Sequence, residues 1–174
     1  MEYGCIGKKL GHSFSKIVHN QLADYPYELV ELPPEALDGF MRRADFKAIN
    51  VTIPYKEAVI PYLDEVSDTA RQIGAVNTIV RREGRLYGYN TDMAGMTALL
   101  RRQGVSLTGK KVLVTGSGGT SKTAVATARA LGAAQVVRLS RTAREDAVTY
   151  ADARRLHGDA QALINTTPCG MYPH

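Results

Sequence analysis

The sequence predicts an α/β protein of two successive units, the first built on a mainly parallel sheet. Apolar strands alternate with amphipathic helices from Tyr3 to about residue 53, which is the pattern of a parallel sheet with right-handed crossovers. A linker rich in turn-forming residues spans 104–109. After it, a strand enters a glycine-rich turn that opens a helix, the beginning of a Rossmann-type dinucleotide-binding fold. We therefore predict a first domain at 1–103 and a dinucleotide-binding domain at 104–174.

The composition is that of a globular protein with a good hydrophobic core. The 174 residues are 44% hydrophobic and 22% charged, which is the usual range for such proteins. The N-terminus lacks a basic region followed by a long apolar run, and no stretch approaches the roughly 18 apolar residues of a membrane span. We therefore expect a cytoplasmic protein with no membrane partner.

The net charge of +5 raises the question of a nucleic-acid partner. The basic residues are scattered, mostly as arginine pairs at the ends of predicted elements. No basic run of five occurs and no aromatic residues are interleaved with the arginines, as they are in proteins that stack bases. We expect no nucleic-acid partner, since a phosphorylated small molecule accounts for the charge equally well.

Cys5 and Cys169 are the two cysteines, and they lie far apart in the sequence. Neither has a partner at metal-ligand spacing, so no metal site is expected. Free buried thiols are the favoured interpretation, with a disulfide between them as the open alternative.

The first strand, 3–7, leads through a polar loop into a helix whose apolar residues are Ile17, Val18 and Leu22. Ser13 and Ser15 stand at the entrance of this helix. A serine there is most often an N-cap. Two serines, framed by His12 and Asn20, favour instead a site where the helix N-terminus receives an anion. His12 and His19 are interpreted as structural.

A second strand, 27–32, and a helix opened by two prolines precede a third strand at 48–53. In that strand Ile49, Val51 and Ile53 are expected on one face, with Asn50 and Thr52 on the other. Pro54 ends the strand because it has no N–H for the ladder. Lys56 then stands at the start of a helix predicted at 57–63, at the mouth of the sheet. The alternative is an ordinary solvated lysine.

A hairpin is predicted from 74–80 and 86–89, with its turn at Glu83-Gly84, and a helix follows at 93–102. Asp92 lies in the first helical turn, where a negative charge is favourable to the helix dipole even without a function. However, Lys56, Asn77 and Asp92 all stand at or near strand ends, which is where open α/β sheets bind their ligands. The three residues are therefore candidates for one site.

The glycine-rich turn at 116–121 follows a strand at 111–115 and opens a helix that runs to about Leu131. Gly116 permits the tight turn, and Gly118 lets the backbone approach a pyrophosphate at the helix N-terminus. Ser121 replaces the third glycine of the general pattern. With a strand before it and a helix after it, the turn is predicted to bind a dinucleotide.

The next strand, 135–139, ends at Ser140 and Arg141, where an NAD-binding unit commonly carries an acidic residue for the ribose 2′-hydroxyl. That acid is missing. Arg141 can bind a 2′-phosphate and stack on an adenine, so NADP is the preferred cofactor. Arg144 is a second candidate, and either arginine has the alternative of being a solvated surface residue. One more strand, 162–165, follows, and only the first half of the fold is expected.

With these motifs in view, the sequence resembles the shikimate dehydrogenase family along its whole length. The matching segments are 11–15, 19–20, 50–56, 74–78, 88–92, 116–119, 140–142 and 165–171. The resemblance implies NADP-dependent reduction of 3-dehydroshikimate to shikimate in aromatic amino acid (chorismate) biosynthesis. Lys56 and Asp92 would be the catalytic pair. The substrate residues that it implies are Ser13, Ser15, Thr52, Asn77 and Asp92. The cofactor residues that it implies are Gly116, Ser117, Gly118, Gly119, Thr120, Ser140, Arg141, Thr142, Thr166 and Met171.

The chain departs from the family pattern at a few places. Lys9 and Lys16 stand where the family usually has proline, and Ser140 replaces a common asparagine. Family members also continue beyond the matched part, so the 174 residues alone are expected to be inactive and to leave the edge of strand 111–115 open. The alternatives are a quinate/shikimate dehydrogenase that uses NAD and a noncatalytic binding or regulatory module. A monomer or homodimer is expected.

Overall fold

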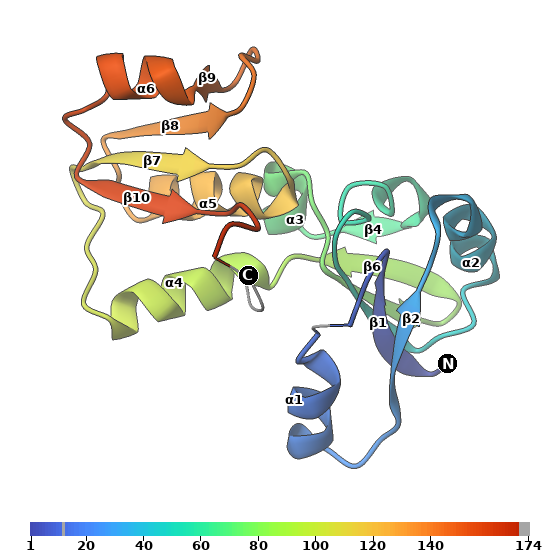
Figure 1. Cartoon of the computed structure of the whole chain (residues 1–174). Coiled ribbons are helices and arrows are strands. Elements are labelled where there is room, and N and C mark those ends of the chain that lie inside the picture. The colour runs from blue at the N-terminus through green and yellow to red at the C-terminus, as the bar shows by residue number, and fades with distance from the viewer. Residues whose placement is uncertain (12, 171–174) are drawn as a thin grey trace. The chain divides into compact units, whose positions relative to one another are not determined.

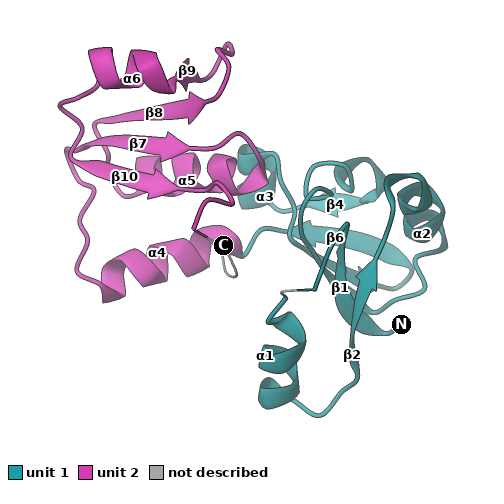
Figure 2. Cartoon of the chain, in the orientation of Figure 1, with its two compact units in different colours: residues 1–91 teal, residues 92–174 magenta. Residues whose placement is uncertain are grey.

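The computed structural model describes residues 1–11 and 13–170, and it divides the chain into two compact units, 1–91 and 92–174 (Figures 1 and 2). The sequence prediction put the domain boundary between 103 and 104, after the helix α4 (Asp92–Arg102). The structure assigns α4 to the second unit because Met96 and Leu100 of this helix pack against the core of that unit. No helix in the described part of the chain is both long and apolar enough to cross a bilayer.

The first unit is a six-stranded sheet in the order β2-β1-β3-β5-β6-β4. Its strands are β1 (Tyr3–Gly7), β2 (Tyr27–Glu31), β3 (Ala48–Val51), β4 (Glu65–Val66), β5 (Thr78–Arg82) and β6 (Arg85–Tyr89). The pairs β1–β2, β1–β3 and β4–β6 are parallel, whereas β3–β5 and β5–β6 are antiparallel. The sheet is therefore mixed, with a parallel half around β1.

One face of this sheet carries the main core of the unit. Ile6, Ile49 and Ile79 from three adjacent strands are almost fully buried. They pack with Met41 of α2 (Leu37–Arg43) and Ala70 of α3 (Asp68–Ile73), so both helices cover this face. Because side chains alternate along a strand, the neighbouring residues of β1, β3 and β5 point to the other face.

On the other face, α1 (Ser15–Leu22) lies at the β1–β2 end and contacts β2. A small cluster forms there from Cys5, Leu10 and Tyr27. No residue of α1 is fully buried. Ile17 and Leu22 are 57% and 73% exposed, so the apolar side of this helix is largely open in the described part of the chain.

The segment between β3 and β5 differs most from its prediction. The strand ends at Val51, and Ile53 is 63% exposed instead of continuing the buried face. No α-helix forms at 57–63. Turns lead to a 3₁₀ helix at Ile60–Tyr62, a second 3₁₀ helix lies at Pro34–Ala36 before α2, and β4 follows as a strand that was not predicted. Pro54 and Pro61 both lack the N–H that a continuous helix needs.

The second unit is a four-stranded parallel sheet in the order β10-β7-β8-β9. The strands are β7 (Lys111–Thr115), β8 (Gln135–Ser140), β9 (Val148–Thr149) and β10 (Ala162–Asn165). The helices α4 and α5 (Gly119–Ala130) pack on the face with Val112 and Val114, and α6 (Tyr150–Leu156) packs through Ala153 on the face with Val137. These layers can be followed in Figure 1.

The prediction that β7 has an open edge is wrong. Strand β10 pairs with it in parallel, with Leu113 opposite Leu163 and Thr115 opposite Asn165. Strand β7 is therefore central, and β10 stands at the edge of the described sheet. The chain thus contains, in addition to the predicted first half of the dinucleotide fold, the strand that lies on the far side of β7.

Candidate functional site

The predicted substrate residues Thr52 and Asn77 lie at the ends of neighbouring strands of the first unit. The Thr52 N–H donates to the Ile6 carbonyl at 2.9 Å, and the Val51 N–H donates to the Asn77 carbonyl at 2.8 Å. Backbone hydrogen bonds therefore hold Thr52, which follows β3, against β1, and Asn77, which precedes β5, against β3.

Lys56 lies in the turns that follow β3 and does not begin a helix. Its carbonyl accepts a 2.7 Å hydrogen bond from the Val76 N–H, which places the lysine backbone beside the residue that precedes Asn77. The ammonium group also influences Cys5 of β1. Burial raises the pKa of the Cys5 thiol to about 11, and the nearby charge of Lys56 opposes part of this rise.

Asn77 is 8% exposed, and its amide joins two segments. Its Nδ2 donates to Thr91 Oγ1 at 2.9 Å, and its Oδ1 accepts from the Thr91 N–H at 2.9 Å. Thr91 immediately precedes Asp92, the first residue of α4. The Asn77 side chain therefore fixes the backbone that leads into the predicted catalytic aspartate.

The two serines before α1 are arranged differently from a helix cap. The helix begins at Ser15, and the residue at the N-cap position is Phe14, which makes no side-chain cap. Ser13 Oγ accepts a 3.3 Å hydrogen bond from the Ser15 N–H. Ser13 thus satisfies the N–H of the first helical residue from one position before the N-cap, which is a structural role. The Ser15 hydroxyl makes no cap. His12 lies outside the described residues.

His19 holds α1 on the sheet. Its ring stacks on Tyr27 of β2, with ring centroids 3.9 Å apart and planes 10° apart, and its Nδ1 is 2.5 Å from the Tyr25 hydroxyl. This geometry agrees with the interpretation of His19 as structural.

A chain of polar side chains crosses this same face of the sheet. The Tyr27 hydroxyl donates to Asn50 Oδ1 at 2.6 Å, Asn50 Nδ2 donates to Thr78 Oγ1 at 3.3 Å, and the Thr78 hydroxyl donates to Asn77 Oδ1 at 3.0 Å. At the near end the Ser15 side chain lies close enough to the Tyr27 hydroxyl to oppose part of the rise in the pKa of Tyr27 that burial causes. Neither Tyr27 nor Thr78 was predicted from the sequence to be a site residue. The sequence feature that could have identified them is the alternation of side chains along β2 and β5, which places both hydroxyls on the sheet face of Asn50.

The glycine turn of the second unit has the backbone geometry expected of it. Gly116 has φ of +113°, and a Cβ there would lie 2.5 Å from Thr166 Oγ1, so only glycine fits. Gly118 is the N-cap of α5, and a Cβ at this position would meet no atom within 4 Å. Ser121 is fully buried and its hydroxyl donates to the Gly118 carbonyl at 2.7 Å. A small serine thus allows the close packing that the third glycine usually provides.

The other predicted cofactor residues of this unit lie at the ends of the strands that flank β7. Ser140, at the end of β8, donates to the Thr142 carbonyl at 2.7 Å and so shapes the turn that presents the exposed Arg141. Thr166, after β10, donates to the Thr115 carbonyl through both its N–H and its hydroxyl. The turn at 116–119, residues 140–142 and Thr166 therefore share the carboxyl end of one sheet. Met171 lies outside the described residues.

The two cysteines are both free, but only Cys5 is buried. Cys169 is exposed, which corrects the expectation of two buried thiols.

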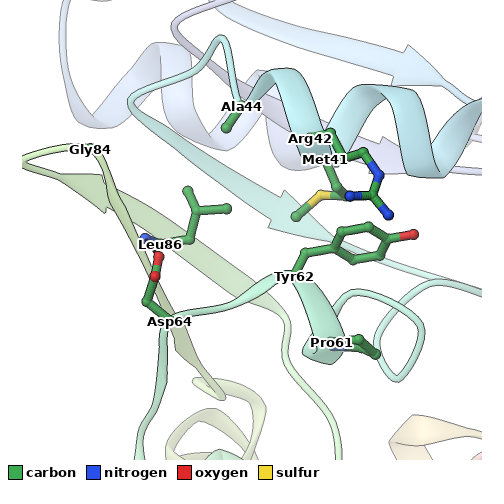
Figure 3. A pocket seen from close by; sticks show the side chains of 8 residues that line it. All are labelled: Met41, Arg42, Ala44, Pro61, Tyr62, Asp64, Gly84 and Leu86. Carbon is green, nitrogen blue, oxygen red and sulfur yellow. Dashed lines mark hydrogen bonds between the residues drawn. The ribbon is translucent and has the colours of Figure 1, made fainter.

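A pocket of about 440 Å³ lies elsewhere in the first unit, and Figure 3 shows the eight residues around it. They are Met41, Arg42, Ala44, Pro61, Tyr62, Asp64, Gly84 and Leu86. Both charged groups already have partners: Arg42 pairs with Asp38 at 2.9 Å, and Asp64 accepts a 2.7 Å hydrogen bond from the Leu86 N–H. None of the predicted site residues lines this pocket.

Comparison with known proteins gives a consistent result. A family model described as the shikimate dehydrogenase substrate binding domain matches residues 5–79. The NADP(+)-dependent shikimate dehydrogenase of Clostridium beijerinckii is 37% identical over 188 residues, which cover 98% of this chain and 69% of that protein.

Solved structures show the same likeness. The structure of shikimate dehydrogenase 1 from Peptoclostridium difficile matches with a TM-score of 0.89 and 33% identity, over all of this chain and 70% of that one. A shikimate 5-dehydrogenase from Thermus thermophilus, solved in complex with NADP(H) and shikimate, matches with a TM-score of 0.83 and 33% identity, over 97% of this chain and 69% of that one.

Proposed function

The chain belongs to the shikimate dehydrogenase family, and we propose that the protein that carries this sequence catalyses the NADPH-dependent reduction of 3-dehydroshikimate to shikimate, a step toward chorismate and the aromatic amino acids. The 174 residues alone, which span about 70% of the relatives' length, are still predicted to be inactive. One observation supports the proposal: in each unit the proposed residues gather at the edge of the sheet where a central parallel strand ends, β3 in the first unit, with Asn77 beside that end where the antiparallel β5 begins, and β7 in the second. The first unit has Thr52, Lys56 and Asn77 there, and the second has the glycine turn. Open α/β sheets bind their ligands at such ends.

The substrate side of the proposal uses residues that the first unit holds by backbone contacts. Ser13, Ser15, Thr52 and Asn77 supply hydroxyl and amide groups that suit a small acid with several hydroxyl groups. Lys56 is proposed to donate a proton to the carbonyl oxygen, since a positioned ammonium group can act as a general acid. Asp92 is proposed to act with it, as a carboxylate that orients the ammonium group and accepts a substrate hydrogen bond.

The cofactor side rests on the second unit, whose residues fit a dinucleotide. The space over Gly118 is open and the N-terminus of α5 begins there, so backbone N–H groups can receive a pyrophosphate. Gly116, Ser117, Gly119 and Thr120 form the rest of this turn, and Thr166 supports it from β10. Arg141, with Ser140 and Thr142 shaping its turn, is proposed to hold the 2′-phosphate. NADPH, when bound, supplies the hydride.

The proposal extends to two further points. The protein is proposed to act in the cytoplasm, and as a monomer or homodimer. Met171 is proposed to lie near the nicotinamide, by its match to the family motif at 165–171.

The experiment that tests the function is an assay of the protein carrying this sequence with 3-dehydroshikimate and NADPH, followed by the loss of NADPH absorbance. Parallel reactions contain NADH, and the reverse direction is assayed with shikimate and with quinate. Reduction with NADPH and oxidation of shikimate by NADP support the proposal. A preference for NAD together with quinate oxidation would instead indicate the quinate/shikimate enzyme. Binding of shikimate without turnover would indicate a noncatalytic module.

A further inference from the structure

We propose that Tyr27, Asn50 and Thr78 are positioning residues. They hold the serine loop, which carries Ser13 and Ser15, at a fixed separation from Asn77 and so set the affinity for the substrate acid. This inference rests on the proposed function, because Ser15 and Asn77 are the substrate residues at its two ends. The three positioning residues lie on three different strands of one sheet face, and none of them belongs to the proposed substrate or cofactor groups.

The register of the sheet brings these side chains into line. Asn50 pairs with Thr78 across β3 and β5, and it also pairs with Cys5 of β1. Tyr27 pairs with Tyr3, two residues before Cys5. The Tyr27 ring therefore extends diagonally over the small side chain of Cys5, and its hydroxyl reaches Asn50 Oδ1 at 2.6 Å. A larger residue at position 5 would obstruct this contact.

The side-chain amide of Asn50 and the hydroxyls of Tyr27 and Thr78 all have hydrogen-bond partners in this series. Asn50 accepts from Tyr27 through Oδ1 and donates through Nδ2 to Thr78 Oγ1 at 3.3 Å. Thr78 then donates to Asn77 Oδ1 at 3.0 Å. Burial raises the pKa of the Tyr27 hydroxyl above its ordinary range, so it stays protonated and able to donate. Polar groups linked in this way in a partly buried setting reinforce one another.

The position of Ser15 depends on this series of hydrogen bonds more than the position of Asn77 does. Asn77 is held by the backbone of Val51 and Tyr89 and by Thr91. In contrast, α1 has no fully buried residue. The His19 ring stacked on Tyr27 joins the helix to β2, and the loop before it is held by the Leu10 N–H, which donates to Glu31 Oε1 at 2.6 Å. A binding group on a weakly held segment loses affinity because ligand binding must first order it.

The experiment compares Tyr27→Phe and Thr78→Val, which each remove one hydroxyl while keeping the shape of the side chain. Thr78→Ser restores the hydroxyl and is the conservative rescue. Tyr87→Phe is the matched control, because Tyr87 lies on the same sheet face in β6 but outside the chain of hydrogen bonds. Shikimate affinity is measured by calorimetry, and KM and kcat are measured with 3-dehydroshikimate and NADPH.

Tyr27→Phe and Thr78→Val are each expected to weaken shikimate binding and to raise KM by about fivefold to tenfold, the effect of losing about one net hydrogen bond. The value of kcat and the affinity for NADP are expected to stay within about twofold, and Thr78→Ser and Tyr87→Phe are expected to behave like the unchanged protein. The double variant is expected to lose no more affinity for shikimate than either single variant, because both substitutions break the same series of hydrogen bonds. Wild-type affinity in both single variants would overturn the inference.

A second measurement decides the inference without any substrate. Hydrogen exchange at the Ser15 amide, which donates to Ser13 Oγ, is expected to become severalfold faster in Thr78→Val, although Thr78 lies two strands away from β1. Unchanged exchange at Ser15 would overturn the inference even if the protein proved to bind no shikimate. Failure of the unchanged protein to bind or turn over shikimate, with the exchange effect present, would instead overturn the proposed function alone.

Discussion

The Val76 N–H donates a 2.7 Å hydrogen bond to the carbonyl of Lys56, and this contact links the turn after β3 to the segment that enters β5. Asn77, the next residue, then bonds Thr91. Two short loops that are far apart in the sequence are thus fixed to each other, and the proposed acid and the proposed substrate amide come from these two loops.

We predict that Lys56→Ala lowers kcat by roughly 100-fold or more while changing KM much less, because it removes the proton donor and not the main binding groups. Steady-state kinetics with 3-dehydroshikimate and NADPH measure both values. Lys47→Ala is the control, since Lys47 is an exposed lysine paired with Glu2 on the surface. A near-normal kcat in Lys56→Ala would exclude the acid role.

Arg141→Ala is expected to weaken NADP binding by about tenfold or more and to leave NAD binding almost unchanged. The lost contact is a charge-assisted hydrogen bond to the 2′-phosphate, worth about 1.5–3 kcal/mol. Dissociation constants for both dinucleotides are measured by fluorescence or calorimetry. Arg129→Ala, at an exposed position in the last turn of α5, is the matched control. An equal loss for NADP and NAD would mean that Arg141 supports the fold and does not read the phosphate.

Cys5 is expected to make the protein less stable in alkali. Its thiol has a pKa of about 11 in the folded state because of burial, against 9.0 ordinarily. The folded state therefore binds more protons than the unfolded state between pH 9 and 11, so stability is full below about pH 9 and falls as the pH rises through this window. Melting temperatures from pH 8 to 11 measure the slope, which is expected to be shallower in Cys5→Ala. Equal slopes in the two proteins would contradict the assignment to Cys5.

Glu83 and Gly84 form the turn between β5 and β6, both with positive φ, +51° and +79°. A two-residue hairpin turn of this kind favours asparagine followed by glycine, and glutamate resists a left-handed backbone. We predict that Glu83→Asn stabilises the protein by about 0.5–1 kcal/mol, seen as a higher denaturant midpoint. Gly84→Ala is the opposing variant and is expected to destabilise. A lower midpoint for Glu83→Asn would show that the glutamate side chain has a stabilising role at this turn.

Local patterns predicted the elements that depend on local chemistry. The strand at 3–7, the hairpin turn at Glu83-Gly84 and the glycine turn at Gly116 all appear where they were expected. In each case a few adjacent residues determine the backbone conformation, and the resulting element needs little information from the rest of the chain.

Features that depend on distant partners were predicted less well. Periodicity identified the apolar side of α1, yet it could not indicate that Ile17 and Leu22 would stay exposed. The helix expected at 57–63 had suitable apolar spacing, but Pro54 and Pro61 favour turns and a 3₁₀ helix. The partner of β7 was missed because the pairing with β10 joins residues about fifty positions apart. The hydroxyls of Tyr27 and Thr78 likewise meet Asn50 only through the sheet register.

The position of β10 beside β7 has a consequence for the order in which the second unit is assembled. Pairing β7 with β8 closes a loop that contains only α5, whereas pairing it with β10 closes a longer one, and longer closures form later. Thr166 follows β10 and bonds the Thr115 carbonyl next to Gly116. The phosphate-binding turn thus gains its last support only when β10 docks, and a nascent chain acquires it only after residue 166 has left the ribosome.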